Sequence, residues 1–107
     1  MSLQGFTALA AAAALCFASA AAHAKGTVHT VVIQGLQNAP ASITVKRGDT
    51  VVWVNKDPFP HTVTSRGNFD SKDIPPDGKW KYVARKAGTY DYICKYHPNM
   101  KGSVKVE

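Results

Sequence analysis

The fold of this chain is decided by the stretch Thr89-Tyr90-Asp91-Tyr92-Ile93-Cys94, which runs directly into Lys95-Tyr96-His97-Pro98-Asn99-Met100. Side chains alternate between the two faces of a strand, so Tyr90, Tyr92 and Cys94 share one face. If the tyrosines are core residues, Cys94 points into the protein where the strand ends, and the following loop covers that end. The stretch therefore predicts a β-strand that delivers a shielded thiol to the side chains of a short loop.

The rest of the chain after its first 24 residues reads as further short strands separated by turns. We expect strands over residues 27–33, 42–45, 50–55, 61–65, 79–83 and 103–106, whereas residues 69–74 are ambiguous. Turn-forming residues separate these runs, for example in Lys46-Arg47-Gly48-Asp49 and Pro75-Pro76-Asp77-Gly78. We find no amphipathic helix of useful length and no internal repeat. Short strands with turn signals about every 8–12 residues are typical of an all-β sandwich or barrel.

The loop after residue 93 carries a thiol, an imidazole and a thioether at three-residue intervals, on Cys94, His97 and Met100. A thiolate with imidazoles and a weak axial thioether is the ligand set of blue-copper electron-transfer sites. The second imidazole must come from elsewhere, and His61 in Pro58-Phe59-Pro60-His61-Thr62-Val63 is the candidate. The sequence thus predicts a metal site for one copper ion at His61, Cys94, His97 and Met100.

Alternatives to a copper site remain open from the residues alone. His61 and His97 are also compatible with ordinary loop residues, and Met100 with core filling. Zinc is a second option, although structural zinc sites prefer more thiolates or carboxylates, and a catalytic zinc would use Met poorly. Asp57 is the nearest carboxylate in sequence, and we interpret it as a solvated loop charge. No nucleophile pair or general base accompanies the ligands, so we do not expect an enzyme.

The N-terminal 24 residues are interpreted as a secretory signal peptide. Residues 8–22 are apolar except for Ser19, and Ala22-His23-Ala24 fits a small-x-small cleavage site, so that Lys25 opens the mature chain. An uncleaved membrane anchor and a lipoprotein signal at Cys16 are the alternatives. We expect residues 25–107 to form one copper-binding domain in the periplasm, as a monomer without stable membrane insertion.

Cysteine content and charge narrow the function further. Cys94 is the only cysteine after residue 24, and a lone thiol in an oxidising compartment needs a metal, a reactive role or a disulfide-linked partner chain. All 13 Lys and Arg and all 7 Asp and Glu lie after residue 24, so the net charge of the mature chain is 13 − 7 = +6. The cations are scattered, and the chain is exported. We therefore do not expect nucleic acid as a partner. We expect a protein partner with an acidic surface. His29 is interpreted as a plain strand residue without a partner.

Three stretches resemble the cupredoxins, and within them the amicyanin and plastocyanin group, over roughly residues 40–107. They are Gly48-Asp49-Thr50-Val51-Val52-Trp53-Val54-Asn55, Pro60-His61-Thr62-Val63, and the run from Ala87 through Cys94-Lys95-Tyr96-His97-Pro98-Asn99-Met100 to Gly102. The resemblance implies a Greek-key β-sandwich of about seven to eight strands. It implies type 1 copper on His61, Cys94, His97 and Met100. The chain departs from the group at Thr62, where relatives usually carry Asn, and at Tyr96, where amicyanin-like loops carry Pro.

The function implied is that of a small periplasmic blue copper protein. It would carry single electrons between a donor and an acceptor, such as a dehydrogenase, a cytochrome or an oxidase. Copper trafficking or sequestration is the alternative from another class, and a metal-free interaction domain is a third. We expect docking through an apolar ring of Pro58, Phe59, Pro60 and Pro98 around the imidazole of His97. Lys56, Lys95 and Lys101 would form a basic rim that attracts an acidic partner.

Overall fold

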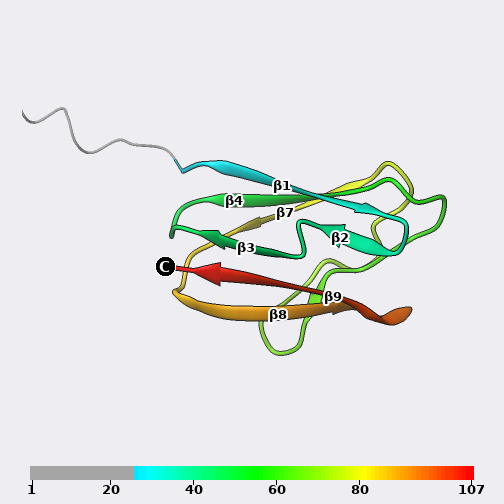
Figure 1. The fold of residues 1–107 in the computed structure, drawn as a ribbon. Helices are drawn as coiled ribbons and strands as arrows, with labels where there is room; N and C mark the ends of the chain where they lie inside the picture. The colour runs from blue at the N-terminus through cyan, green and yellow to red at the C-terminus, as the bar shows by residue number, and fades with distance from the viewer. Residues whose placement is uncertain (1–25) are drawn as a thin grey trace, which may run out of the picture.

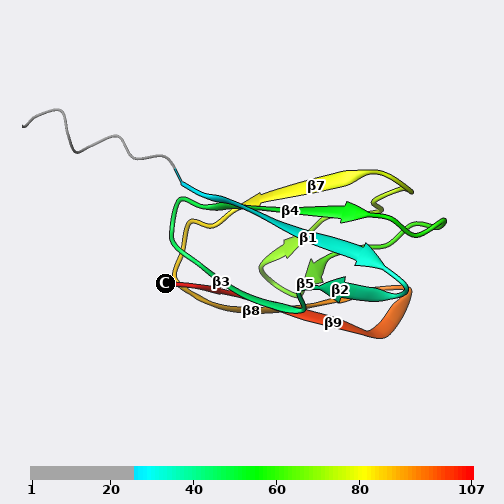
Figure 2. The ribbon, with the colours of Figure 1, turned by 45° about the horizontal axis from the view of Figure 1, so that its top comes forward.

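The computed structural model describes residues 26–107 as two packed β-sheets (Figure 1). The first sheet has the order β2-β1-β4-β7, with β1 at Val28–Gln34, β2 at Gln37–Ala39, β4 at Thr50–Asn55 and β7 at Lys79–Val83. The second has the order β3-β9-β8-β5-β6, with β3 at Ser42–Val45, β5 at Thr64–Ser65, β6 at Phe69–Asp70, β8 at Gly88–Cys94 and β9 at His97–Val106. Figure 2 shows the two layers, with β1, β4 and β7 above β3, β8 and β9.

The all-β, two-sheet sandwich expected from the sequence is confirmed. Residues 26–107 form nine strands rather than seven to eight, because Gln37–Ala39 forms a three-residue strand where only a break was expected, and Phe69–Asp70 forms a two-residue one. Residues 26–107 contain no helix long and apolar enough to cross a membrane. The expected signal peptide, residues 1–24, lies outside the described residues.

The core forms where the two inner faces meet around Trp53. Trp53 on β4 is fully buried, and its indole N–H donates to the hydroxyl of Tyr92 on β8 over 3.1 Å. The two rings meet edge to face with centroids 5.4 Å apart. A buried indole and phenol each need a polar partner, and this bond satisfies both across the two sheets. Tyr92 and Cys94 are buried and Tyr90 packs against the core, so the predicted common face is confirmed.

The ligand-bearing loop is tighter than expected. β9 begins at His97, six residues earlier than the strand predicted at residue 103, and Cys94 pairs directly with His97 across the turn. A register shift between Ile93 and Cys94 accompanies this turn. The predicted strand over residues 61–65 is shorter than expected, because His61 instead forms an isolated bridge with Ile74. The turn from β8 to β9 and the segment carrying His61 therefore meet at one end of the sandwich.

At the opposite end of the sandwich, Asp49 binds several neighbouring groups. Its carboxylate accepts backbone N–H groups of Lys46 and Thr27 and lies 2.9 Å from Nε2 of His29. The backbone bond from Lys46, then His29 and Thr27, lower the pKa of Asp49 to about 2. The expectation that His29 lacks a partner was wrong, because β1 runs parallel to β4 and brings His29 beside Asp49, the residue just before β4.

Candidate metal centre

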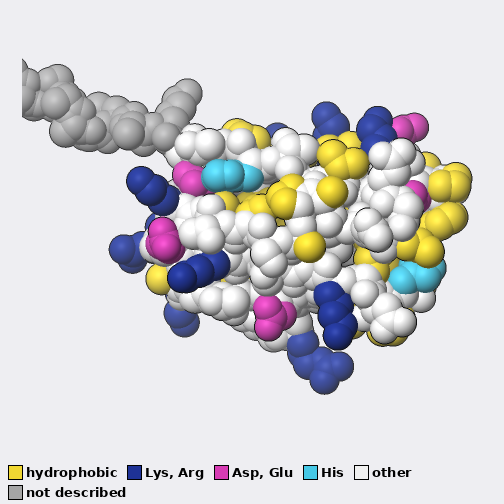
Figure 3. Space-filling view, viewed as in Figure 1, with side chains coloured by type: hydrophobic (Ala, Val, Ile, Leu, Met, Phe, Trp, Pro, Cys, Tyr) yellow, Lys and Arg dark blue, Asp and Glu magenta, His cyan; other side chains and the backbone are white. Residues whose placement is uncertain are grey.

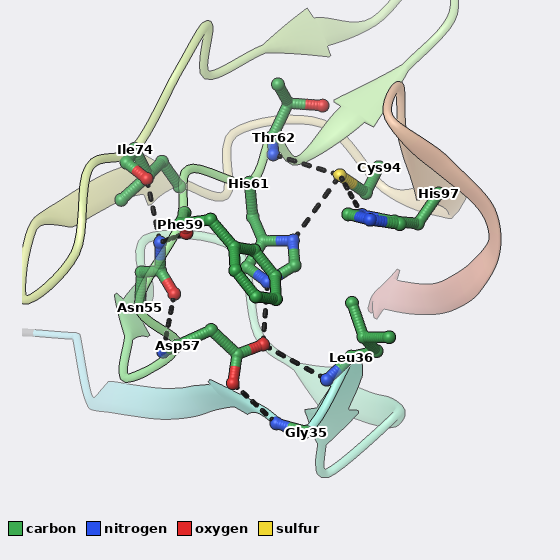
Figure 4. A network of polar contacts seen from close by, with 10 residues as sticks. All are labelled: Gly35, Leu36, Asn55, Asp57, Phe59, His61, Thr62, Ile74, Cys94 and His97. Carbon is green, nitrogen blue, oxygen red and sulfur yellow. Dashed lines mark hydrogen bonds and ion pairs between the residues drawn. The ribbon is translucent and has the colours of Figure 1, made fainter.

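Three of the four predicted ligands converge at the end of the sandwich. The Sγ atom of Cys94 lies 3.6 Å from Nδ1 of His61 and 3.9 Å from Nδ1 of His97 (Figure 4). These donor atoms all lie within 4.8 Å of one another. Metal–nitrogen and metal–sulfur bonds of about 2.0–2.3 Å place two ligands of one ion about 3–4 Å apart. The spacing therefore fits a single ion between the three side chains.

The three residues differ in exposure. His61 is fully buried and Cys94 is 1% exposed, whereas His97 is only half-buried. A disulfide to a second chain, the alternative considered for Cys94, needs an accessible thiol and is disfavoured by this burial. Met100, on β9, is also buried and belongs to the hydrophobic core. It lines a surface hollow together with His97 and Leu36.

A buried carboxylate holds His61, and sequence reasoning did not find its role. Asp57 Oδ2 lies 2.7 Å from Nε2 of His61, and Asp57 is 6% exposed. The interpretation of Asp57 as a solvated loop charge, with no carboxylate beside the ligands, was wrong. The chain returns on itself between β4 and His61, so two residues four apart in a loop come into contact. Their spacing in the sequence gives no periodic signal for this.

The carboxylate of Asp57 is itself satisfied by the turn between β1 and β2. It accepts the backbone N–H of Gly35 at 2.7 Å and of Leu36 at 3.0 Å, while Asn55 Oδ1 accepts the backbone N–H of Asp57 (Figure 4). Burial raises the pKa of Asp57, but the N–H groups of Leu36 and Gly35 and the contact with His61 outweigh it and lower the pKa. An ionised carboxylate only accepts hydrogen bonds, so Nε2 of His61 carries the proton. The lone pair of Nδ1 is then left facing Cys94.

Thr62 ties the two ligand-bearing segments together. Its backbone N–H donates to Sγ of Cys94 at 3.3 Å, and its hydroxyl accepts the backbone N–H of Lys95 at 3.0 Å. Thr62 is 2% exposed, and its contact with the thiol is buried. The departure from Asn at this position therefore leaves the connection between the segments intact, because a hydroxyl oxygen accepts the same kind of bond.

An apolar surface surrounds the exposed edge of His97. Phe59, Pro60, Tyr96 and His97 line one hollow there, and the centroids of the Phe59 and His97 rings lie 5.9 Å apart. Figure 3 shows hydrophobic side chains gathered at this end of the molecule. Of the expected basic rim, Lys56 pairs with Asp77 at 3.3 Å and Lys95 with Asp70 at 3.0 Å. The rim is therefore less basic than the sequence suggested.

The two-sheet β-sandwich and the cluster of two imidazoles and one thiol are typical of cupredoxins. Comparison with known proteins agrees with this class. Residues 5–106 match the cupredoxin-like domain family, and the chain belongs to that family. The chain is similar to amicyanin-alpha of Methylorubrum extorquens, at 36% identity over 94% of this chain and 98% of the relative. It is also similar to amicyanin of Paracoccus versutus, at 33% identity over 82% of this chain and 71% of the relative.

Solved structures give the same result. The structure of an amicyanin mutant in the Cu(I) state superimposes with a TM-score of 0.72 at 30% identity, over 75% of this chain and 82% of that one. The plastocyanin of Scenedesmus fuscus is a further similar sequence, at 31% identity over 64% of this chain and 84% of the relative. The resemblance to the amicyanin and plastocyanin group is thus confirmed.

Proposed function

We propose that this protein is a small blue (type 1) copper protein that carries single electrons between redox partners. His61, Cys94, His97 and Met100 would hold one copper ion, which supplies a centre that cycles between Cu(I) and Cu(II). The observation that carries the proposal is the buried thiol of Cys94 faced by Nδ1 atoms of two imidazoles. A trigonal set of two His and one Cys with a weak axial Met suits both copper oxidation states.

Different residues around the site would have different roles in holding the copper ion and passing the electron. Asp57 fixes the tautomer and orientation of His61, as hydrogen-bonded carboxylates commonly do for ligating imidazoles. The backbone N–H of Thr62 donates toward Cys94, and burial keeps water from the thiol. The half-buried imidazole of His97 gives the centre an edge at the surface, where an electron can pass to a partner.

The cellular location and the partners are further parts of this proposal. We place the mature protein, residues 25–107, in the periplasm after removal of residues 1–24, as a monomeric carrier rather than an enzyme. A donor and an acceptor protein would dock on the apolar surface around His97. The net charge of +6 favours partners with an acidic docking face.

A copper titration combined with voltammetry tests this proposal. We expect one copper ion per chain and a reversible one-electron wave, and we expect the wave to disappear in Cys94→Ser. Copper that passes readily to a competing chelator, without a reversible wave in the wild-type protein, would instead support trafficking or sequestration.

A further inference from the structure

A short segment, residues 70–74, lies against the residues around His61. We call it the brace segment. Ile74 N donates to the carbonyl of His61 at 2.8 Å, and His61 N donates to the carbonyl of Ile74 at 3.2 Å. Ser71 N donates to the carbonyl of Val63 at 2.9 Å, and Val63 N donates to the hydroxyl of Ser71 at 2.7 Å. The brace segment is therefore fastened by two hydrogen bonds to His61 and by two more to Val63, two residues further along the same segment.

The brace segment also contacts the loop that carries the second histidine. The hydroxyl of Tyr96 donates to Oδ1 of Asp73 at 2.6 Å, and Nζ of Lys95 lies 3.0 Å from Oδ2 of Asp70. Exposed ion pairs contribute little because water and salt screen them. The hydrogen bond from Tyr96 to Asp73 is the shorter of the two contacts, and it comes from the residue directly before His97. It is therefore the contact that bears most directly on the position of the second histidine.

The backbone of the brace segment is held in an unusual shape just before Asp73. Lys72 adopts a left-handed conformation with φ of 62°, which is uncommon for a residue with a Cβ atom. Asp70 Oδ1 accepts the backbone N–H of Lys72 at 2.9 Å, and Ser71 Oγ donates to the carbonyl of Lys72 at 2.7 Å. These local bonds hold the bend, and the next residue, Asp73, meets Tyr96.

We infer that residues 70–74 brace the metal centre by linking the His61 segment to the His97 loop, with Tyr96 as the positioning residue. The inference rests on the proposed function, because an electron-transfer centre works best when its ligands hold nearly one geometry in both oxidation states. The amicyanin-like loops that this one resembles carry Pro before the second histidine, and a Pro ring fixes its own backbone. Tyr96 lacks that ring and restricts the loop through its side chain instead.

A double-mutant cycle tests the brace on the protein with and without copper. Tyr96→Phe removes the donor and Asp73→Ala removes the acceptor, and both residues are exposed, so the variants should fold. We expect each single variant to lower the denaturation midpoint of the metal-free protein, and the double variant to lower it no further. Asp73→Asn retains an acceptor and should recover most of the loss.

Motion of the loop provides the readout that a purely structural contact would not move. In Tyr96→Phe and Asp73→Ala, NMR relaxation dispersion should show increased exchange at residues 95–99 in both metal states. Tyr90→Phe is the matched control, because its hydroxyl donates to the Lys86 carbonyl at 2.6 Å on an exposed turn remote from the site. It should leave the motion of residues 95–99 unchanged.

Additive effects of the two substitutions, or unchanged loop motion in both single variants, would overturn the brace. The metal-free measurements do not depend on copper. If the double-mutant cycle and the loop motion agree with the brace but the wild-type protein gives no voltammetric wave, the proposed function is refuted. The link between the two segments would still be supported.

Discussion

At the scale of single residues, Asp57 shows how the site is prepared before any metal arrives. The side chain receives hydrogen bonds from two backbone N–H groups of the turn between β1 and β2 and fixes the proton on Nε2 of His61. The imidazole therefore needs no rearrangement to present Nδ1 toward Cys94. Such contacts behind a metal ligand commonly alter affinity and activity by about 10–100-fold.

Asp57→Asn should weaken this arrangement, because an amide offers one acceptor atom where the carboxylate offers two. At least one buried N–H group then loses its partner, at a cost of about 1–3 kcal/mol in the free energy of unfolding. With copper bound, loss of the negative charge should raise the reduction potential, since Cu(II) carries one more positive charge than Cu(I). Denaturation of the metal-free protein and voltammetry measure the two effects.

Asp91→Asn is the matched control, because Asp91 is exposed on β8. It should change neither quantity appreciably. If Asp57→Asn behaves like this control in both measurements, Asp57 does not position His61.

At the scale of elements, the pairing of β8 with β9 determines where the site can form. Tyr92 pairs with Gly102 across the two strands, and its ring lies over that glycine. A Cβ atom at residue 102 would fall 2.2 Å from Cζ of Tyr92 and 2.3 Å from its hydroxyl oxygen. The absence of a side chain at Gly102 therefore allows Tyr92 to reach Trp53 in the opposite sheet.

Gly102→Ala should displace the ring of Tyr92 and weaken its hydrogen bond with Trp53. We expect a loss of about 1–3 kcal/mol in the free energy of unfolding, as for other overpacked cores. Ser103→Ala, one residue further along β9, serves as the control. Equal stability of the two variants in thermal denaturation would show that the core accommodates the added methyl group.

The sequence predicts the elements well where hydrophobic alternation is strong. The strands at residues 42–45, 50–55 and 79–83 were predicted with the bounds that the structure shows. The segment from His61 to Ile74 was not, because its pairing consists of a bridge, two-residue strands and side-chain bonds that leave no periodic pattern. The three converging donors were predicted from their chemistry, whereas Asp57 and the contact of Tyr96 with Asp73 depend on loop geometry.

At the scale of the whole molecule, the end remote from the site contributes to stability in acid through Asp49. The pKa of Asp49 is about 2 in the folded protein, against an ordinary value of 3.8. A lowered pKa contributes stability above the unfolded value of 3.8, and this contribution is lost as the pH falls through the folded value of about 2.

The free energy of unfolding should therefore fall between about pH 4 and pH 2, and it should fall less steeply in Asp49→Asn. Denaturation curves at stepped pH measure both slopes. Asp91→Asn should keep the wild-type slope, and an equally steep fall in Asp49→Asn would refute this role of Asp49.

The charge of the whole molecule should also appear in its redox kinetics. The net charge is +6, but two cations near the site are paired. Figure 3 shows further Lys and Arg side chains at the opposite end of the molecule. Lys46 lies between β3 and β4, where its backbone N–H donates to Asp49. Oxidation of the Cu(I) protein by hexacyanoferrate(III), an anion, should slow as ionic strength rises, because salt screens attraction beyond about 8 Å at physiological ionic strength.

Two variants of equal net charge locate the entry point of that anion. Lys101→Glu lies next to Met100, whereas Lys46→Glu lies at the far end, and both positions are exposed. Stopped-flow rates should fall more for Lys101→Glu. Equal rates for the two variants would show that electron transfer does not occur at the His97 end.

The visible absorption spectrum of the Cu(II)-loaded protein tests the central claim most directly. A thiolate bound to Cu(II) between two imidazoles gives an intense charge-transfer absorption, so the wild-type protein should be strongly blue or green. Cys94→Ala should retain the fold and lose the colour. A colourless Cu(II) complex of the wild-type protein would contradict a copper centre built on Cys94.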